Sequence, residues 1–81
     1  MNKDWNGFVK FISDYTGVPV EEITEQTDMY EDLFLDSLGM FSFGAQVSEK
    51  FEVKVPLSKV ATVSKAGEIY QLIAEAMQEG K

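Results

Sequence analysis

Chemistry in this 81-residue sequence could reside in the pair Asp36-Ser37, which interrupts the mainly apolar stretch Leu33 to Phe43. The chain has no histidine and no cysteine, so the usual general base for a serine nucleophile and the commonest zinc ligands are both missing. We therefore expect neither an enzyme nor a metal site. A serine that the chain cannot activate can still be modified by another protein, or the pair can simply cap a helix.

The acidic charge is unevenly distributed. Fourteen acidic residues stand against seven lysines, giving a formal net charge of −7 at pH 7, and no basic residue occurs between Phe11 and Glu49. Such a surface repels phosphate backbones and attracts basic protein surfaces. We expect no nucleic-acid binding. A solvated acidic loop that keeps a small protein soluble is the simpler explanation of this segment, and docking of basic partners is the alternative.

The length predicts a single domain spanning residues 1–81, because so short a chain can build only one hydrophobic core. No apolar run is long enough to cross a membrane, and the first residues mix charged with apolar side chains, unlike a signal peptide. These features predict a soluble cytoplasmic protein that does not insert into membranes, and we expect a monomer.

The hydrophobic spacing predicts helices and little else. An amphipathic helix starting at Trp5 should end near Gly17-Val18-Pro19, and a helix after Ser64, its expected N-cap, should close at Gly80. Between them we expect a long acidic loop over residues 19–35, a middle helix, an extended connector over residues 51–55 and one turn over residues 58–60. In the long loop, four apolar side chains are expected to point inward: Val20, Ile23, Leu33 and Phe34.

The middle helix, Ser37 to Phe51, has two apolar lines. The core face should consist of Met40, Phe43, Gly44, Val47 and Phe51. Leu38, Phe41 and Ala45 form the second line, beside the polar face. A helix buried on all sides would explain that line as well as an exposed docking surface does, although so small a bundle has little interior to cover both.

Three segments together carry a resemblance to a known family. Asp36-Ser37-Leu38, the segment Phe51-Glu52-Val53-Lys54-Val55-Pro56 and Thr62-Val63 before the last helix resemble the acyl carrier protein family, over about residues 5–78. The resemblance implies an all-α, small four-helix bundle with three main helices and one short helix. It further implies that Ser37 receives 4′-phosphopantetheine covalently, that the thiol of this arm holds an acyl group as a thioester, and that Asp36 contributes to magnesium coordination while the arm is transferred.

The same resemblance implies partners. These are a phosphopantetheinyl transferase, an acyl- or aminoacyl-loading ligase, and the synthases and transferases of fatty-acid, polyketide or related biosynthesis. A docking surface should then consist of Leu38, Phe41 and Ala45 together with the loop acids Glu31 and Asp32, whose charge would steer basic enzymes toward the serine.

One departure from the family pattern keeps alternatives open. Common fatty-acid carriers have an acidic middle helix, whereas Gly39, Ser42 and Ser48 occupy several of those acidic places here. The Asp-Ser-x-Gly order is similar to D-alanyl carrier proteins, so an aminoacyl load is a second hypothesis. An unmodified acidic interaction module, in which Ser37 only caps the helix, is a third.

Overall fold

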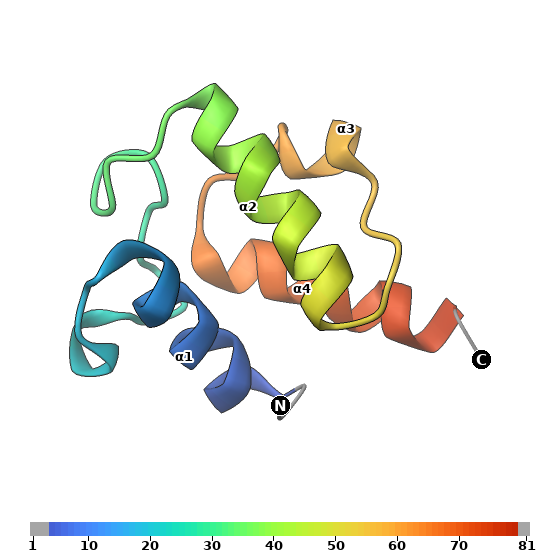
Figure 1. Ribbon diagram of the computed structural model, residues 1–81, viewed down its shortest axis with the longest axis horizontal. Helices are drawn as coiled ribbons and strands as arrows, with labels where there is room; N and C mark the ends of the chain where they lie inside the picture. Colours follow the sequence, from blue (N-terminus) through green and yellow to red (C-terminus); the bar gives the residue numbers. More distant parts are fainter. Residues whose placement is uncertain (1–3, 80–81) are drawn as a thin grey trace.

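The computed structural model describes residues 4–79, and within this range the chain forms four α-helices and one 3₁₀ helix (Figure 1). The elements are α1 (Trp5–Thr16), η1 (Val20–Glu22), α2 (Ser37–Lys50), α3 (Leu57–Val60) and α4 (Ala66–Glu79). The only strand-like pairing among the described residues is an isolated bridge between Asp28 and Lys65. The predicted all-α bundle with three main helices and one short helix is confirmed.

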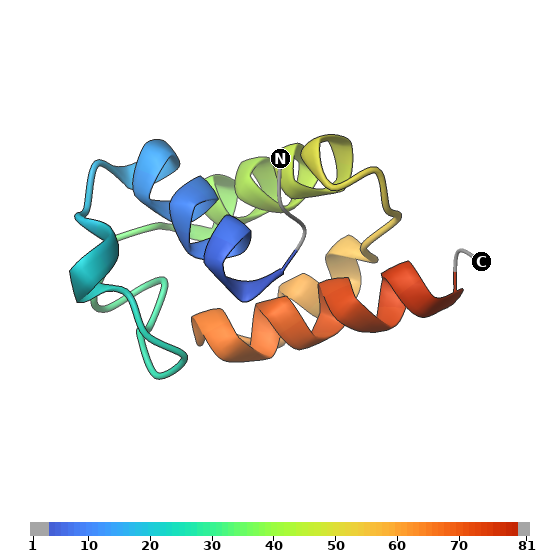
Figure 2. The ribbon, with the colours of Figure 1, turned by 90° about the horizontal axis from the view of Figure 1, so that it is seen from below.

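The helices pack in two layers. Figure 2 shows α1 and α2 on one side of the molecule and α4 running along the other, with the short α3 next to α4. The long loop between η1 and α2 closes one end of the bundle (Figures 1 and 2). Within the described residues, no helix is long and apolar enough to span a membrane.

The ends of α1 follow from its flanking residues. The Asp4 side chain accepts a hydrogen bond of 2.9 Å from the Gly7 N–H, which caps the first turn. Gly17 lies in the left-handed region, with φ of 82°, and its N–H donates to the Ser13 carbonyl at 2.7 Å. Glycine adopts this conformation without strain, so the helix ends there as predicted.

The beginning of α4 corrects one prediction. The helix starts at Ala66, and the Lys65 carbonyl accepts its first intrahelical hydrogen bond, from the Ile69 N–H, so Lys65 rather than Ser64 holds the N-cap position. The Glu68 carboxylate accepts from the N–H groups of Ser64 and Lys65 instead. A side chain reaching back from the first turn thus replaces the expected serine cap. The predicted closure at Gly80 lies outside the described residues.

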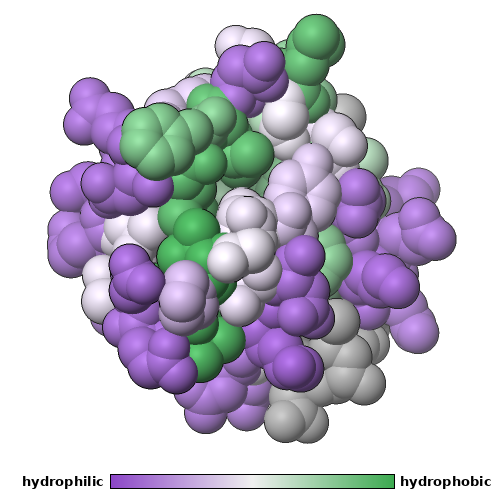
Figure 3. All heavy atoms as spheres, turned by 60° about the vertical axis from the view of Figure 1, so that its left-hand side comes forward, coloured by the Kyte–Doolittle hydropathy of each residue, from purple (hydrophilic) through white to green (hydrophobic). Residues whose placement is uncertain are grey.

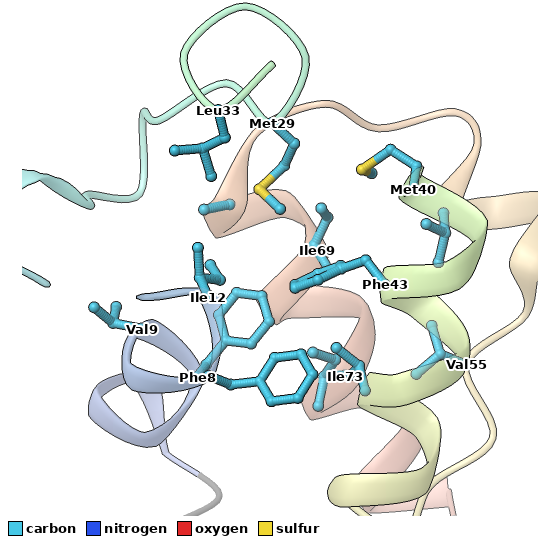
Figure 4. Close-up of a cluster of buried hydrophobic side chains, with 14 of the residues drawn as sticks. Phe8, Val9, Ile12, Met29, Leu33, Met40, Phe43, Val55, Ile69 and Ile73 are labelled. Carbon is cyan, nitrogen blue, oxygen red and sulfur yellow. The ribbon is translucent and has the colours of Figure 1, made fainter. Parts of the chain in front are cut away.

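Aromatic rings fill the centre of the core. Phe43 of α2 is fully buried and its ring lies 5.4 Å from that of Phe11 and 6.1 Å from that of Phe8, both on α1. The predicted core face of α2 is confirmed, because all five of its members are buried: Met40, Phe43, Gly44, Val47 and Phe51. Figure 4 shows how α1, α2 and α4 contribute to this cluster, with Ile69 and Ile73 entering from α4.

The long loop is held on the core by a few side chains. Ile23, Met29 and Leu33 are buried, and Figure 4 shows Met29 and Leu33 reaching from the loop toward the helices. The prediction was wrong for two of the four loop residues. Val20 is 43% exposed, and Phe34 is 86% exposed. The tightly turned loop can direct only part of its apolar side chains toward the bundle, and Met29 takes the most deeply buried place in it.

Candidate functional site

Ser37 is the first residue of α2, and its side chain is exposed. The helix cap is provided by the preceding residue: the Asp36 carboxylate accepts a hydrogen bond of 2.7 Å from the Gly39 N–H, and the Asp36 carbonyl accepts from the Met40 N–H at 2.8 Å. Because Asp36 satisfies the first turn, the Ser37 hydroxyl is not needed as a cap. The hydroxyl therefore stands in solvent at the positive end of a 14-residue helix.

Gly39 lies beside this cap. A Cβ atom at position 39 would lie 3.1 Å from Oδ1 of Asp36, a tight contact with the end of a side chain, and 3.4 Å from a methyl carbon of Leu35, an ordinary packing distance. The Gly39 carbonyl accepts a hydrogen bond of 3.4 Å from the Tyr15 hydroxyl, which ties the first turn of α2 to α1. The first turn of α2 is thus held by Asp36 through the Gly39 N–H and by Tyr15 of α1 through the Gly39 carbonyl.

The loop before Ser37 is organised by Asp28. Its Oδ1 accepts hydrogen bonds of 2.9 Å from the N–H groups of Tyr30 and Glu31, and its own N–H donates to the Asp32 carboxylate at 2.8 Å. The hydrogen bond from the Glu31 N–H is the main cause that lowers the pKa of Asp28 below its ordinary value, because it stabilises the carboxylate form. From the sequence alone, Asp28 is one acid among several in the loop over residues 19–35.

Backbone hydrogen bonds attach this loop to the start of α4. The Met29 N–H donates to the Ser64 carbonyl at 2.7 Å, the Ala66 N–H to the Thr27 carbonyl at 2.8 Å, and the Gly67 N–H to Glu25 at 3.0 Å. The Leu35 N–H then donates to the Met29 carbonyl at 3.0 Å, two residues before Ser37 itself. The position of the serine therefore depends on α4 as well as on α2.

The second apolar line of α2 is exposed. Leu38 is 79% exposed and Phe41 41% exposed, and Ala45 is exposed one turn further along the helix. The alternative of a helix buried on all sides is therefore excluded. Figure 3 shows the face that carries the long loop and the beginning of α2, where apolar side chains form a band between hydrophilic ones.

The predicted acidic docking residues also lie in solvent, in the loop that leads to α2. Glu31 and Asp32 are both exposed, although one oxygen of the Asp32 carboxylate is engaged by the Asp28 N–H. No group of three or more acidic side chains able to hold a metal ion occurs within residues 4–79.

Phe34, three residues before Ser37, does not lie where the sequence predicted. It was expected inside the core, but it is the most exposed of the large apolar residues in the described chain. Its φ of 60° lies in the left-handed region, where a bulky side chain is strained. No local pattern in the sequence indicates its exposure, because the alternation of an extended segment does not apply to a residue with a left-handed backbone.

A groove of about 480 Å³ between α1 and η1 is separate from these residues. Its lining contains none of the predicted site residues and consists of Trp5, Asn6, Val9, Lys10, Val20, Glu21 and Ile23.

The geometry around Ser37 suits a phosphate-linked arm. A phosphodiester on the serine oxygen would be solvated and would lie at the N-terminus of α2, where the helix dipole favours negative charge. An attached group would also begin beside the exposed Leu38 rather than inside the core. The residues present therefore fit the 4′-phosphopantetheine that the sequence resemblance implied.

Comparison with known proteins agrees with this geometry. Residues 7–73 match the family described as phosphopantetheine attachment site. The chain is 30% identical over 73 residues to the meromycolate extension acyl carrier protein of Mycobacterium leprae (strain TN), an alignment that covers 90% of this chain but only 64% of that protein. It is 31% identical over 71 residues to an acyl carrier protein of Rhodococcus erythropolis (strain PR4 / NBRC 100887), covering 88% of this chain and 78% of the relative. The chain therefore belongs to the acyl carrier protein family, whose members are carriers rather than enzymes and hold phosphopantetheine at an attachment site.

Proposed function

We propose that Ser37 is the attachment residue and that the protein carries an acyl group as a thioester on the 4′-phosphopantetheine arm. The observation that supports this most directly is that Asp36, and not Ser37, caps the helix. Asp36 caps the helix, which leaves the neighbouring hydroxyl exposed and free for an incoming enzyme. Ser37 is also the only one of the six serines that directly follows an acidic residue.

The arm, when attached, supplies a terminal thiol that forms the thioester. The chain's own residues would have the following roles. Ser37 provides the oxygen that bonds to phosphorus, Asp36 shares a magnesium ion during transfer of the arm, and the exposed line of Leu38, Phe41 and Ala45 sets the register of docking. Glu31 and Asp32 would steer basic partners toward the serine.

An acyl load is favoured over an aminoacyl load. The relatives that support this choice include carriers named for meromycolate extension and for acyl groups in general. We propose that the partners are a phosphopantetheinyl transferase and the loading ligase, synthases and transferases of a fatty-acid, polyketide or related pathway. The chain covers 64% of the length of the meromycolate carrier of Mycobacterium leprae, which is less than two thirds.

The test is loading of the purified protein. Incubation with coenzyme A, magnesium and a broad-specificity phosphopantetheinyl transferase should raise the intact mass of the wild type by one arm and leave Ser37→Ala unchanged. Ser42→Ala is the matched control, because Ser42 is also exposed on α2 but lies in the middle of the helix rather than at its N-terminus. Loading of Ser37→Ala at the wild-type rate would disprove the assignment. Failure of the wild type to load would favour an unmodified interaction module.

A further inference from the structure

Phe34 has an unusual combination of backbone conformation and exposure. Within residues 4–79, only Phe34 and Glu52 adopt a positive φ without being glycine. The conformation of Phe34 is imposed by its neighbours: the Leu33 N–H donates to the Asp28 carbonyl at 3.2 Å, and the Leu35 N–H donates to the Met29 carbonyl at 3.0 Å. Glycine would satisfy this backbone without strain, so folding alone does not account for a phenylalanine here.

The ring gains almost nothing from burial. The side chain is 86% exposed, whereas the adjacent Leu33 is buried and Leu35 is half-buried. A large aromatic group that is both strained and exposed therefore costs stability without contributing to the core. Such residues are concentrated at interaction sites, where the same features become useful once a partner covers the ring.

The position of Phe34 relates it to the proposed attachment site. It precedes Ser37 by three residues, while Leu38 and Phe41 follow the serine on α2 and are also exposed. Exposed large apolar side chains thus flank the hydroxyl on both sides along the chain. An enzyme that brings its active site to Ser37 has to approach a surface of which the Phe34 ring is part.

The charge around the ring selects the kind of partner. Glu31, Asp32 and Asp36 are exposed within three residues of Phe34, and Lys65, the lysine that packs against the loop, is engaged by Asp28 and Gln26. A second copy of this chain would place these acids against each other across a symmetric interface, which is unfavourable for a protein with a net charge of −7. A partner with an apolar pocket bordered by lysine or arginine complements both the ring and the acids.

We propose that Phe34 is an anchor residue that inserts into an apolar, basic-rimmed pocket of the enzymes that act at Ser37. The inference rests on the proposed function, because it assumes that an enzyme visits this serine. It assigns to the loop a contact separate from the helical line of Leu38, Phe41 and Ala45. The left-handed backbone serves to hold the ring outward, away from the buried Leu33.

The experiment measures transferase kinetics with the carrier as the varied substrate. Phe34→Gly and Phe34→Asn both remove the ring while keeping a residue that tolerates a positive φ. We expect the KM of a broad-specificity phosphopantetheinyl transferase for the carrier to rise about tenfold, with kcat little changed, as for loss of one interface anchor. Phe34→Trp, which retains an aromatic ring, should keep a KM close to that of the wild type.

Two controls separate docking from folding. Glu52→Gly replaces the other residue with a positive φ, in the turn after α2 at the end opposite Ser37, and should leave the KM unchanged. The melting temperatures of both Phe34 variants should stay within a few degrees of the wild type, because glycine and asparagine fit this backbone.

The possible failures are distinct. Loading of Phe34→Gly and Phe34→Asn with wild-type KM would overturn the anchor while leaving Ser37 as the attachment site. Absence of any loading of the wild type would overturn the proposed function and this inference with it. A wild-type dimer in sedimentation that becomes a monomer on Phe34→Gly would show that a second copy, rather than an enzyme, covers the ring.

Discussion

The contact between Gly67 and the long loop predicts an unusual response to a helix-favouring substitution. Gly67 lies in the first turn of α4, and its N–H donates to the Glu25 carbonyl at 3.0 Å. A Cβ atom at position 67 would lie 2.9 Å from the Cβ of Glu25 and 3.0 Å from that carbonyl oxygen. Gly67→Ala would therefore push the loop away from α4, because backbone atoms cannot rotate aside as a flexible side chain can.

The expected size of the effect follows from opposing contributions. Alanine is favoured over glycine in a helix by at most about 1 kcal/mol. Forcing a methyl group into a filled contact costs about 1–3 kcal/mol, and loss of the Gly67 hydrogen bond costs about 1 kcal/mol more. We expect Gly67→Ala to lower the free energy of unfolding by about 1–3 kcal/mol. For a domain of this size, that corresponds to a decrease in melting temperature of about 4–24 °C.

Urea denaturation and thermal melting measure the global effect, and amide hydrogen exchange over residues 24–35 shows whether the loop is loosened. Ala74→Gly, later in α4, calibrates the helix-propensity contribution and should cost about 1 kcal/mol. Exchange in the loop should accelerate in Gly67→Ala and remain unchanged in Ala74→Gly. An increase in stability of Gly67→Ala, with unchanged loop exchange, would refute the idea that this contact holds the loop in place.

Two further predictions concern charge. Glu31→Lys should slow association with the transferase more than Glu49→Lys does, because the acids nearest the serine lie in the loop. The difference between the two variants should shrink at high salt. Stopped-flow association rates at two ionic strengths check this, and a larger effect of Glu49→Lys would contradict it. Asp28 and Glu68 both have a lowered pKa in the folded protein, caused mainly by the N–H groups of Glu31 and Lys65 respectively. Since the folded state binds protons less readily, their stabilisation is present above the ordinary carboxyl pKa values and is lost as the pH falls below about 4. Asp28→Asn and Glu68→Gln should therefore flatten the acid limb of melting temperature against pH, and an unchanged limb would show that these carboxylates do not contribute.

Much of the helical framework was predictable because it depends on local patterns. The spacing of apolar residues in α1, α2 and α4 matches the helical period, and Gly17 and Asp36 are residues that end and begin helices for stereochemical reasons. The start of α4 was predicted one residue early, because a Glu68 carboxylate from the first turn replaced the expected serine cap. Such a choice between two capping groups depends on side-chain geometry that the residue order alone leaves open.

The candidate site, like the helices, was predictable from the sequence only in part. The Asp36-Ser37 pair, the exposed acids and the second apolar line of α2 follow from residue types and helical spacing. Whether that line was exposed, and which loop side chains turned inward, depended on how much room the bundle offered. Met29 and Leu33 fill the space under the loop, and Phe34 is left outside on a strained backbone.

The sequence by itself determined that this is a small acidic helical bundle with an acid and a serine at the start of its middle helix, because these properties reside in composition and in neighbouring residues. Tertiary structure alone decided that Met29 and Leu33 are buried while Phe34 stays outside, and that the loop is fastened to α4 by backbone hydrogen bonds. These features depend on packing between distant parts of the chain: the hydrogen bonds that join Met29 to Ser64, Ala66 to Thr27 and Gly67 to Glu25 each connect residues more than thirty positions apart.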